Sequence, residues 1–205
     1  DASGNTVSLA GVEVITGSAG DDTLTVTDDT SVMLDGGDGS DTLTGNVGDD
    51  TLIGGVGSDV IDGGVGADTL IGDVGDDTLI GGEGSDVIDG GDGADTLLGG
   101  LGSDTLIGGG GADVVDCGQD DDLLELDGSA GVTAEGGDGT DTVVLVGETN
   151  EASLSGVEVV TGSAGDDSVT VSTNDIEAIS GGSGIDDVTL TDASGNTVDL
   201  AGVEV

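Results

Sequence analysis

Aliphatic residues recur along the chain every nine positions, and each stands between two residues that are mostly polar or β-branched. The pattern is strictest between residues 36 and 116, where triplets such as Thr51-Leu52-Ile53 alternate with six-residue stretches rich in glycine and aspartate. Alternation over three residues favours a short strand with its central side chain on one face. The pattern predicts one turn and one short strand in every nine residues.

Nine units follow one another without a gap from Gly36 to Asp116. All begin with glycine and carry glycine at the fourth place, aspartate at the sixth and an aliphatic residue at the eighth. Glycine at these places suits turns where the backbone takes positive φ or a Cβ would be costly. Further copies occur at 17–25, 136–144, 162–170 and 181–189, with a decayed copy at 117–125. Such self-similarity indicates a repeat architecture.

Two units form one coil of about 18 residues, in which two short strands face each other across a thin aliphatic interior. The fold we expect is all-β, a right-handed parallel β-roll or β-solenoid with two short strands per coil. The triplet endings also recur after 27 residues, so a three-sided coil of 27 residues is the alternative. The eighth-place residues that should point inward are Leu43, Leu52, Ile61, Leu70, Leu79, Ile88, Leu97, Leu106 and Val115.

The sequence predicts three segments. Residues 1–35 are flanking solenoid strands with one isolated nonapeptide, 36–125 are the nonapeptide β-roll, and 126–205 are degenerate solenoid coils. Residues 192–205 copy residues 1–14 with a single exchange of Ser8 for Asp199, and so begin the next copy. We therefore expect the chain to be one period of a longer tandem array.

Every formally charged side chain is acidic, because the chain has 45 Asp and Glu but no Lys, Arg or His. A net charge of −45 disfavours nucleic acid and anionic lipid, and no run of apolar residues is long enough to span a membrane. We thus expect neither a nucleic-acid partner nor membrane insertion, and metal ions or cationic partners remain. Disorder is the alternative for so acidic a chain, but the 34% of hydrophobic residues are placed periodically.

Stacked coils would align the sixth-place carboxylates in two columns, with neighbours about 5 Å apart. At that spacing two such charges repel by about 3 kcal/mol at an effective dielectric of 20. Bound divalent cations would reverse the sign, and carboxylate and carbonyl oxygens suit Ca²⁺. Without His and with a single Cys, zinc or copper sites cannot form. We predict multiple Ca²⁺ ions and folding coupled to their binding.

The unit G-G-x-G-x-D-x-U-x, in which U is aliphatic, resembles the nonapeptide of RTX proteins, which leave bacteria by type I secretion and fold on calcium outside the cell. The resemblance implies that the sixth-place aspartates and turn carbonyls bind Ca²⁺ between coils. Asp122 is left out because its unit has lost two glycines, and incomplete sites are expected in the isolated units at 17, 162 and 181. The implied ligands are Asp22, Asp41, Asp50, Asp59, Asp68, Asp77, Asp86, Asp95, Asp104, Asp113, Asp141, Asp167 and Asp186.

Other chemistry has little support in the sequence. Cys117 replaces the first glycine of the decayed unit and is expected to be a buried thiol, with an intermolecular disulfide as the alternative. No catalytic or cofactor-binding residues are expected, because the carboxylates repeat along a uniform rod without His or Lys. Ice binding is disfavoured because Val60, Val87 and Val114 interrupt the seventh-place threonines.

The expected function is structural: a secreted, extracellular calcium-binding spacer in a cell-surface adhesin stalk, surface layer or filament. The coil would continue head to tail or self-associate into a fibre. The alternative, which the family resemblance leaves open, is an accessory C-terminal module that aids export and folding of a secreted protease, lipase, epimerase or toxin.

Overall fold

The computed structural model describes residues 6–9, 14–27, 29–127, 130–147, 150–172, 176–191 and 199–201. The copy of residues 1–14 expected at 192–205 lies outside the described residues except at 199–201, where the backbone forms a strand. All regular structure in the described part of the chain is β-strand, and none of it is a helix that could cross a membrane.

The strands alternate along the chain between two parallel sheets of 11 strands each. The odd sheet contains β1 (Thr6–Leu9), β3 (Thr23–Val26), β5 (Thr42–Val47), β7 (Val60–Val65), β9 (Thr78–Glu83), β11 (Thr96–Leu101), β13 (Val114–Gln119), β15 (Ala130–Asp138), β17 (Glu151–Ser155), β19 (Ser168–Val171) and β21 (Asp187–Leu190). The even sheet contains β2 (Val14–Thr16), β4 (Met33–Asp38), β6 (Thr51–Val56), β8 (Thr69–Val74), β10 (Val87–Asp89), β12 (Thr105–Ile107), β14 (Leu123–Asp127), β16 (Thr142–Val146), β18 (Val159–Thr161), β20 (Ala178–Ser180) and β22 (Asp199–Ala201).

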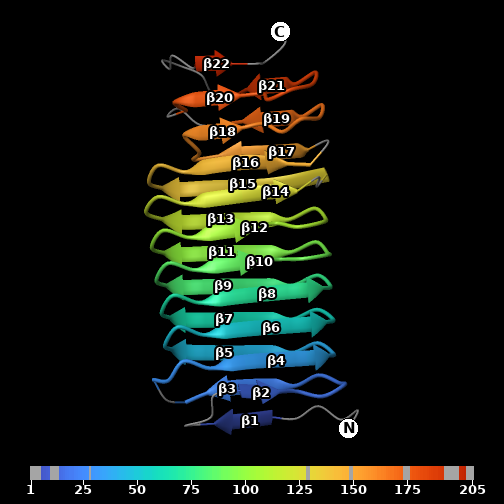
Figure 1. Cartoon of the computed structure of the whole chain (residues 1–205), viewed down its shortest axis with the longest axis vertical. Coiled ribbons are helices and arrows are strands. Elements are labelled where there is room, and N and C mark those ends of the chain that lie inside the picture. The colour runs from blue at the N-terminus through green and yellow to red at the C-terminus, as the bar shows by residue number, and fades with distance from the viewer. Residues whose placement is uncertain are drawn as a thin grey trace.

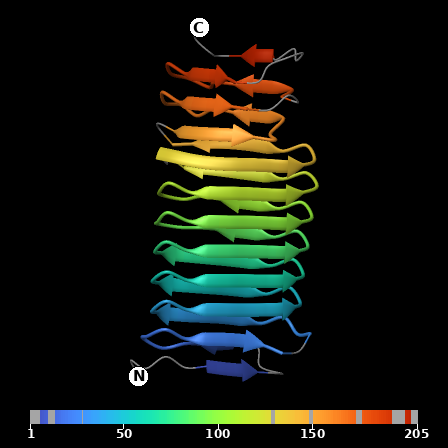
Figure 2. The same cartoon turned by 180° about the vertical axis from the view of Figure 1, so that it is seen from behind.

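The chain climbs as a flattened coil, and its two ends lie at opposite ends of the rod (Figure 1). The strands nearest the viewer run from left to right in Figure 1 and again in the view from behind in Figure 2, while the chain rises. The coil is therefore right-handed, as parallel crossover connections are in almost all proteins.

Strand pairing fixes the length of a coil at 18 residues through the repeats. Thr42 pairs with Val60 in the odd sheet, and Thr51 pairs with Thr69 in the even sheet. This register excludes the three-sided coil, which would pair residues 27 positions apart. The 27-residue recurrence instead places similar triplets alternately on the two sheets, so that Val60-Ile61-Asp62 lies in β7 and Val87-Ile88-Asp89 lies in β10.

One thin layer of side chains fills the space between the sheets. The inward orientation predicted for the eighth-place residues is confirmed, since eight of the nine are 0% exposed and Val115 is 2% exposed. Strands such as β6 show a second buried position two residues further on, which is the first place of the next unit. In the repeats this place holds a glycine, so that the interior beside each turn carries no side chain there.

Candidate metal sites

Aspartates line both edges of the rod in buried rows. The odd-edge column, just before strands of the odd sheet, contains Asp22, Asp41, Asp59, Asp77, Asp95 and Asp113, and resumes with Asp167 and Asp186. The even-edge column contains Asp50, Asp68, Asp86, Asp104, Asp122 and Asp141. None of these side chains is more than 4% exposed. The fold thus buries the sixth-place carboxylates named from the sequence.

One oxygen of each carboxylate is held by the coil before it. The backbone N–H of Asp41 donates to Oδ1 of Asp59 over 2.7 Å, and that of Asp50 donates to Oδ1 of Asp68 over 2.8 Å. The carbonyl of Asp41 in turn accepts the backbone N–H of Val60 over 2.9 Å. These bonds tie consecutive turns together and fix the orientation of each carboxylate.

The other oxygen, Oδ2, is buried without a hydrogen-bond donor in most of the two columns. A buried charged oxygen without a partner is costly, so such groups are normally paired, protonated or bound to a metal. The aspartates concerned are Asp41, Asp50, Asp59, Asp68, Asp77, Asp86, Asp95, Asp104, Asp113, Asp122, Asp141 and Asp186.

The first-place glycine leaves room beside this oxygen. Oδ2 of Asp68 and the carbonyl oxygen of Gly81, from the next coil, lie 2.6 and 2.8 Å from the point that a Cβ on Gly63 would occupy. Around Gly90 the corresponding distances are 2.6 Å to Asp95 and 2.7 Å to Gly108. Two electronegative oxygens therefore converge from adjacent turns, an arrangement that a hard cation would stabilise.

The glycines of one unit serve two different purposes. Gly64 and Gly66, at the second and fourth places, have φ of 104° and 151°, whereas the first-place Gly63 does not have a left-handed φ. The first glycine is thus required for space and the others for backbone conformation. Within the described residues no group of three or more Asp, Glu, Cys or His side chains could hold a metal, so carbonyl oxygens or water must complete any ion's coordination shell.

Burial makes these carboxylates poor acids. It is the largest cause that raises the pKa of Asp68, Asp77, Asp113 and Asp122 to about 6 and that of Asp104 to about 7. The backbone hydrogen bond from the preceding coil lowers each pKa, and neighbouring carboxylates raise it again. Without a cation, the columns therefore carry full charge near neutral pH only at a cost in stability.

Two of the isolated units differ from the repeats. Ser18 and Ser163 replace the second-place glycine, and their backbone N–H groups donate to Oδ2 of Asp22 and Asp167 over 2.7 and 2.9 Å. Their hydroxyls donate to the same two oxygens. Ser18 and Ser163 thus take up the oxygen that is without a donor elsewhere, while Asp186 in the unit at 181 keeps it.

The structure adds three residues that the repeat pattern left out. Asp122 belongs to the even-edge column, and Asp120 with φ 75° replaces the missing fourth-place glycine. Glu158 accepts the backbone N–H of Asp141 over 2.7 Å and continues this column. Asn150 takes the corresponding place in the odd-edge column, where its backbone N–H donates to Oδ1 of Asp167. Residues 153–161, SLSGVEVVT, could have revealed Glu158, since they keep glycine at the fourth place and an acid at the sixth.

Cys117 is 2% exposed and packs in the core, so its thiol lies in the interior. Burial is the main cause that raises the pKa of this thiol above its ordinary range, and the surrounding aspartates add to it. Cys117 is the one described first-place residue of a turn ending in aspartate that carries a side chain.

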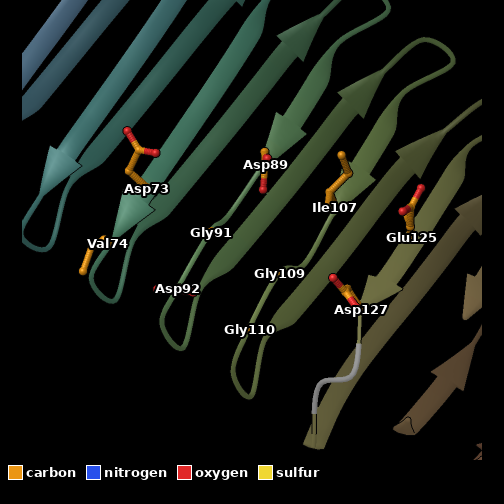
Figure 3. A pocket seen from close by; sticks show the side chains of 10 residues that line it. All are labelled: Asp73, Val74, Asp89, Gly91, Asp92, Ile107, Gly109, Gly110, Glu125 and Asp127. Atoms are coloured by element: carbon orange, nitrogen blue, oxygen red, sulfur yellow. The ribbon is translucent and has the colours of Figure 1, made fainter. Parts of the chain in front are cut away.

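A shallow hollow on the outer face of the even sheet is a separate feature (Figure 3). It is lined by Asp73, Val74, Asp89, Gly91, Asp92, Ile107, Gly109, Gly110, Glu125 and Asp127. Gly91 and Gly109 leave space between the exposed side chains of Asp73 and Asp127. None of its acids belongs to the two columns, so the hollow is a solvated acidic surface.

Stacked, buried carboxylate turns on a parallel β-solenoid define the class of calcium-binding β-roll modules. The profile of the RTX calcium-binding nonapeptide repeat (4 copies) matches residues 9–29, 35–70, 62–97, 71–106 and 89–124. These matches cover more than half of the chain, which therefore belongs to the RTX calcium-binding repeat family, a calcium-binding module of secreted proteins. The comparison with curated proteins gives no match.

Proposed function

We propose that the chain is a calcium-rigidified structural segment of a surface protein, acting as a spacer in an adhesin stalk, surface layer or filament. The observation that carries this proposal is the pair of columns with twelve buried Oδ2 atoms that lack a donor. A protein that binds one ligand needs a single site, whereas these sites recur along both edges of the rod. Repeated sites suit a role in which the ions hold the structure itself together.

The proposed ligands are the sixth-place aspartates of both columns, including Asp122, together with carbonyl oxygens of the adjacent turns. When bound, Ca²⁺ supplies the positive charge that offsets repulsion between neighbouring carboxylates. The protein prepares each site beforehand, because the hydrogen bond to Oδ1 orients the carboxylate and the first-place glycine leaves the space open. The second-place serines at Asp22 and Asp167 make these two the weakest sites.

Extracellular calcium modules bind their ions with dissociation constants of about 10⁻⁴ to 10⁻³ M. With such affinities the segment would stay unfolded inside a cell and fold outside it, which suits type I secretion. The proposal therefore includes an extracellular location at the cell surface.

The ends of the solenoid support continuation into a longer rod. β1 and β21 are the terminal strands of the odd sheet, and β2 and β22 are those of the even sheet. Each terminal strand presents an unpaired edge that can accept another strand. The next copy that begins at residue 192 would extend both sheets in the same direction, either as tandem repeats or as associated subunits.

A calcium titration followed by far-UV circular dichroism and small-angle X-ray scattering tests the proposal, with magnesium as the control ion. We expect an expanded chain in chelator and a rod with strand signal in millimolar calcium. A chain that shows full strand signal in chelator would contradict coupled folding.

Matched triple variants place the effect in the columns. D68N/D86N/D104N removes three even-edge carboxylates, and D38N/D92N/D138N removes the same charge from exposed third-place positions. The first variant should need at least tenfold more calcium to fold, and the second should follow the unmodified chain. Equal calcium midpoints for the two variants would show that the buried columns are not the calcium sites.

A further inference from the structure

The even-edge column continues beyond the last nonapeptide turn at Asp141. β18 pairs with β16 so that Val159 lies opposite Thr142, which places Glu158 before its strand as Asp141 stands before β16. The backbone N–H groups of Glu158 and Val159 both donate to the carbonyl of Asp141, over 3.2 and 3.0 Å, so the turn contains one extra residue here.

The carboxylate of Glu158 replaces that of the usual aspartate. Its Oε2 accepts the backbone N–H of Asp141 over 2.7 Å, as Oδ1 of Asp141 accepts that of Asp122 over 3.0 Å. The longer glutamate side chain therefore spans the distance that the extra residue creates, and the carboxylate returns to the column.

A buried oxygen without a donor faces this turn. Asp141 is 2% exposed, and its Oδ2 has no hydrogen-bond partner. This oxygen lies 2.7 Å from the point that a Cβ on Gly136 would occupy, and the carbonyl oxygen of Gly156 lies nearer still to the same point. The pair of oxygens around Gly136 thus repeats the arrangement around Gly63, although residue 156 lies outside the nonapeptide units.

We propose that Asp141 Oδ2, the Gly156 carbonyl and the Glu158 carboxylate form a further site for a hard divalent cation of the calcium class. The inference rests on the proposed function, since it extends one of the same columns by one coil. Glu158 is only half-buried, so water can supply the remaining ligands that calcium requires.

The odd edge shows what a turn without such a site looks like in the same part of the rod. Asn150 is buried at the sixth place, and its side-chain Nδ2 donates to Oδ1 of Asp167 over 2.9 Å. Leu145, buried at the first place, fills the space that Gly136 leaves open. An amide and an aliphatic side chain thus join these two coils, and the column of cation sites is interrupted there.

Native mass spectrometry of the full chain, with calcium as the only added metal, counts the ions directly. E158Q removes the charge of the proposed ligand and keeps an oxygen that can accept the Asp141 N–H. E151Q is the matched control, because Glu151 is exposed on the outer face of the strand before. G136A is a second probe that closes the space beside Asp141 and changes no charge, and D68N calibrates the loss of a repeat site.

We expect E158Q and G136A each to bind one ion fewer than the unmodified chain, and the double variant to lose no more than either. E151Q should keep every ion, and D68N should lose at least one. If D68N loses ions while E158Q and G136A lose none, the further site is wrong and the calcium columns stand. If D68N also loses none, the proposed calcium function itself is contradicted.

Discussion

Two kinds of turn join the sheets, and they use the interior in opposite ways. In the repeats a first-place glycine such as Gly63 leaves room for the carboxylate of Asp68. In the coil between β14 and β15, Leu126 occupies the first place, and Val132 occupies the sixth, where it is 1% exposed. Val26 and Val32 form a similar pair near the start of the chain.

The difference shows that the first and sixth places act together. A glycine at the first place goes with a buried acid at the sixth, whereas an aliphatic residue goes with Val32, Val132 or Asn150 at the corresponding place. Aliphatic turns are stabilised by the hydrophobic effect alone. Aspartate turns bury charge and need a proton or a cation, so the two kinds of turn should respond differently to pH, calcium and mutation.

Acidification in chelator should produce the largest effect. Burial raises the pKa of Asp68 and Asp77 from 3.8 to about 6, so each contributes stability that is complete below the unfolded value and is lost as the pH rises through the folded value. The loss is about 3 kcal/mol for each such aspartate. We expect the calcium-free chain to fold near pH 4 and unfold by about pH 7. Circular dichroism between these limits measures it, and a strand signal independent of pH would contradict the raised pKa values.

Truncation of an aliphatic turn should come next. Leu126→Ala removes a side chain that is 1% exposed, and such cavities cost about 3 kcal/mol. The melting temperature in saturating calcium should fall, while the number of ions counted by mass spectrometry should not change. Loss of ions in this variant would show that the two kinds of turn are not independent.

Filling the space in an aspartate turn should have a somewhat smaller effect. Gly63→Ala places a methyl group 2.6 Å from Oδ2 of Asp68, so the carboxylate must move away from its site. We expect a loss of about 2 kcal/mol in calcium, together with at least one ion. Gly110→Ala is the matched control, since a Cβ there meets only Oδ1 of Asp92 at 3.6 Å. Unchanged ion binding in Gly63→Ala would contradict the role given to the first place.

The smallest effect is expected at an acid outside the columns. Asp92 is exposed, so Asp92→Asn should change the free energy of unfolding by less than about 0.5 kcal/mol. The neighbouring Asp95→Asn, at a buried sixth place, should clearly weaken calcium binding when both are compared by calorimetry. Equal calcium affinities would remove the distinction between surface and column aspartates.

The fold could be predicted because one nine-residue pattern specifies turn, strand and inward residue together. Leu52 and Leu70 therefore pair in register, as the 18-residue coil requires. The turns outside this pattern were harder to predict. Asp122 keeps its place because Asp120 adopts a left-handed φ that aspartate tolerates, which the loss of a glycine does not indicate.

Glu158 and Asn150 could not be placed from the sequence, because their turns differ in length from the repeat. The extra residue beside Glu158 moves the acid out of the nonapeptide spacing, and only strand pairing shows that it returns to the column. The distinct need for the first-place glycine was hidden for a similar reason, since it depends on Asp68 and the next coil rather than on φ.

A crystal structure of the chain grown in millimolar calcium, with anomalous data for the metal, tests the central claim most directly. We predict two rows of calcium peaks beside the sixth-place aspartates of the two columns, with a gap in the odd-edge row at Val132 and Asn150. Coils in the same register with no metal density beside Asp68, Asp86 and Asp104 would contradict it.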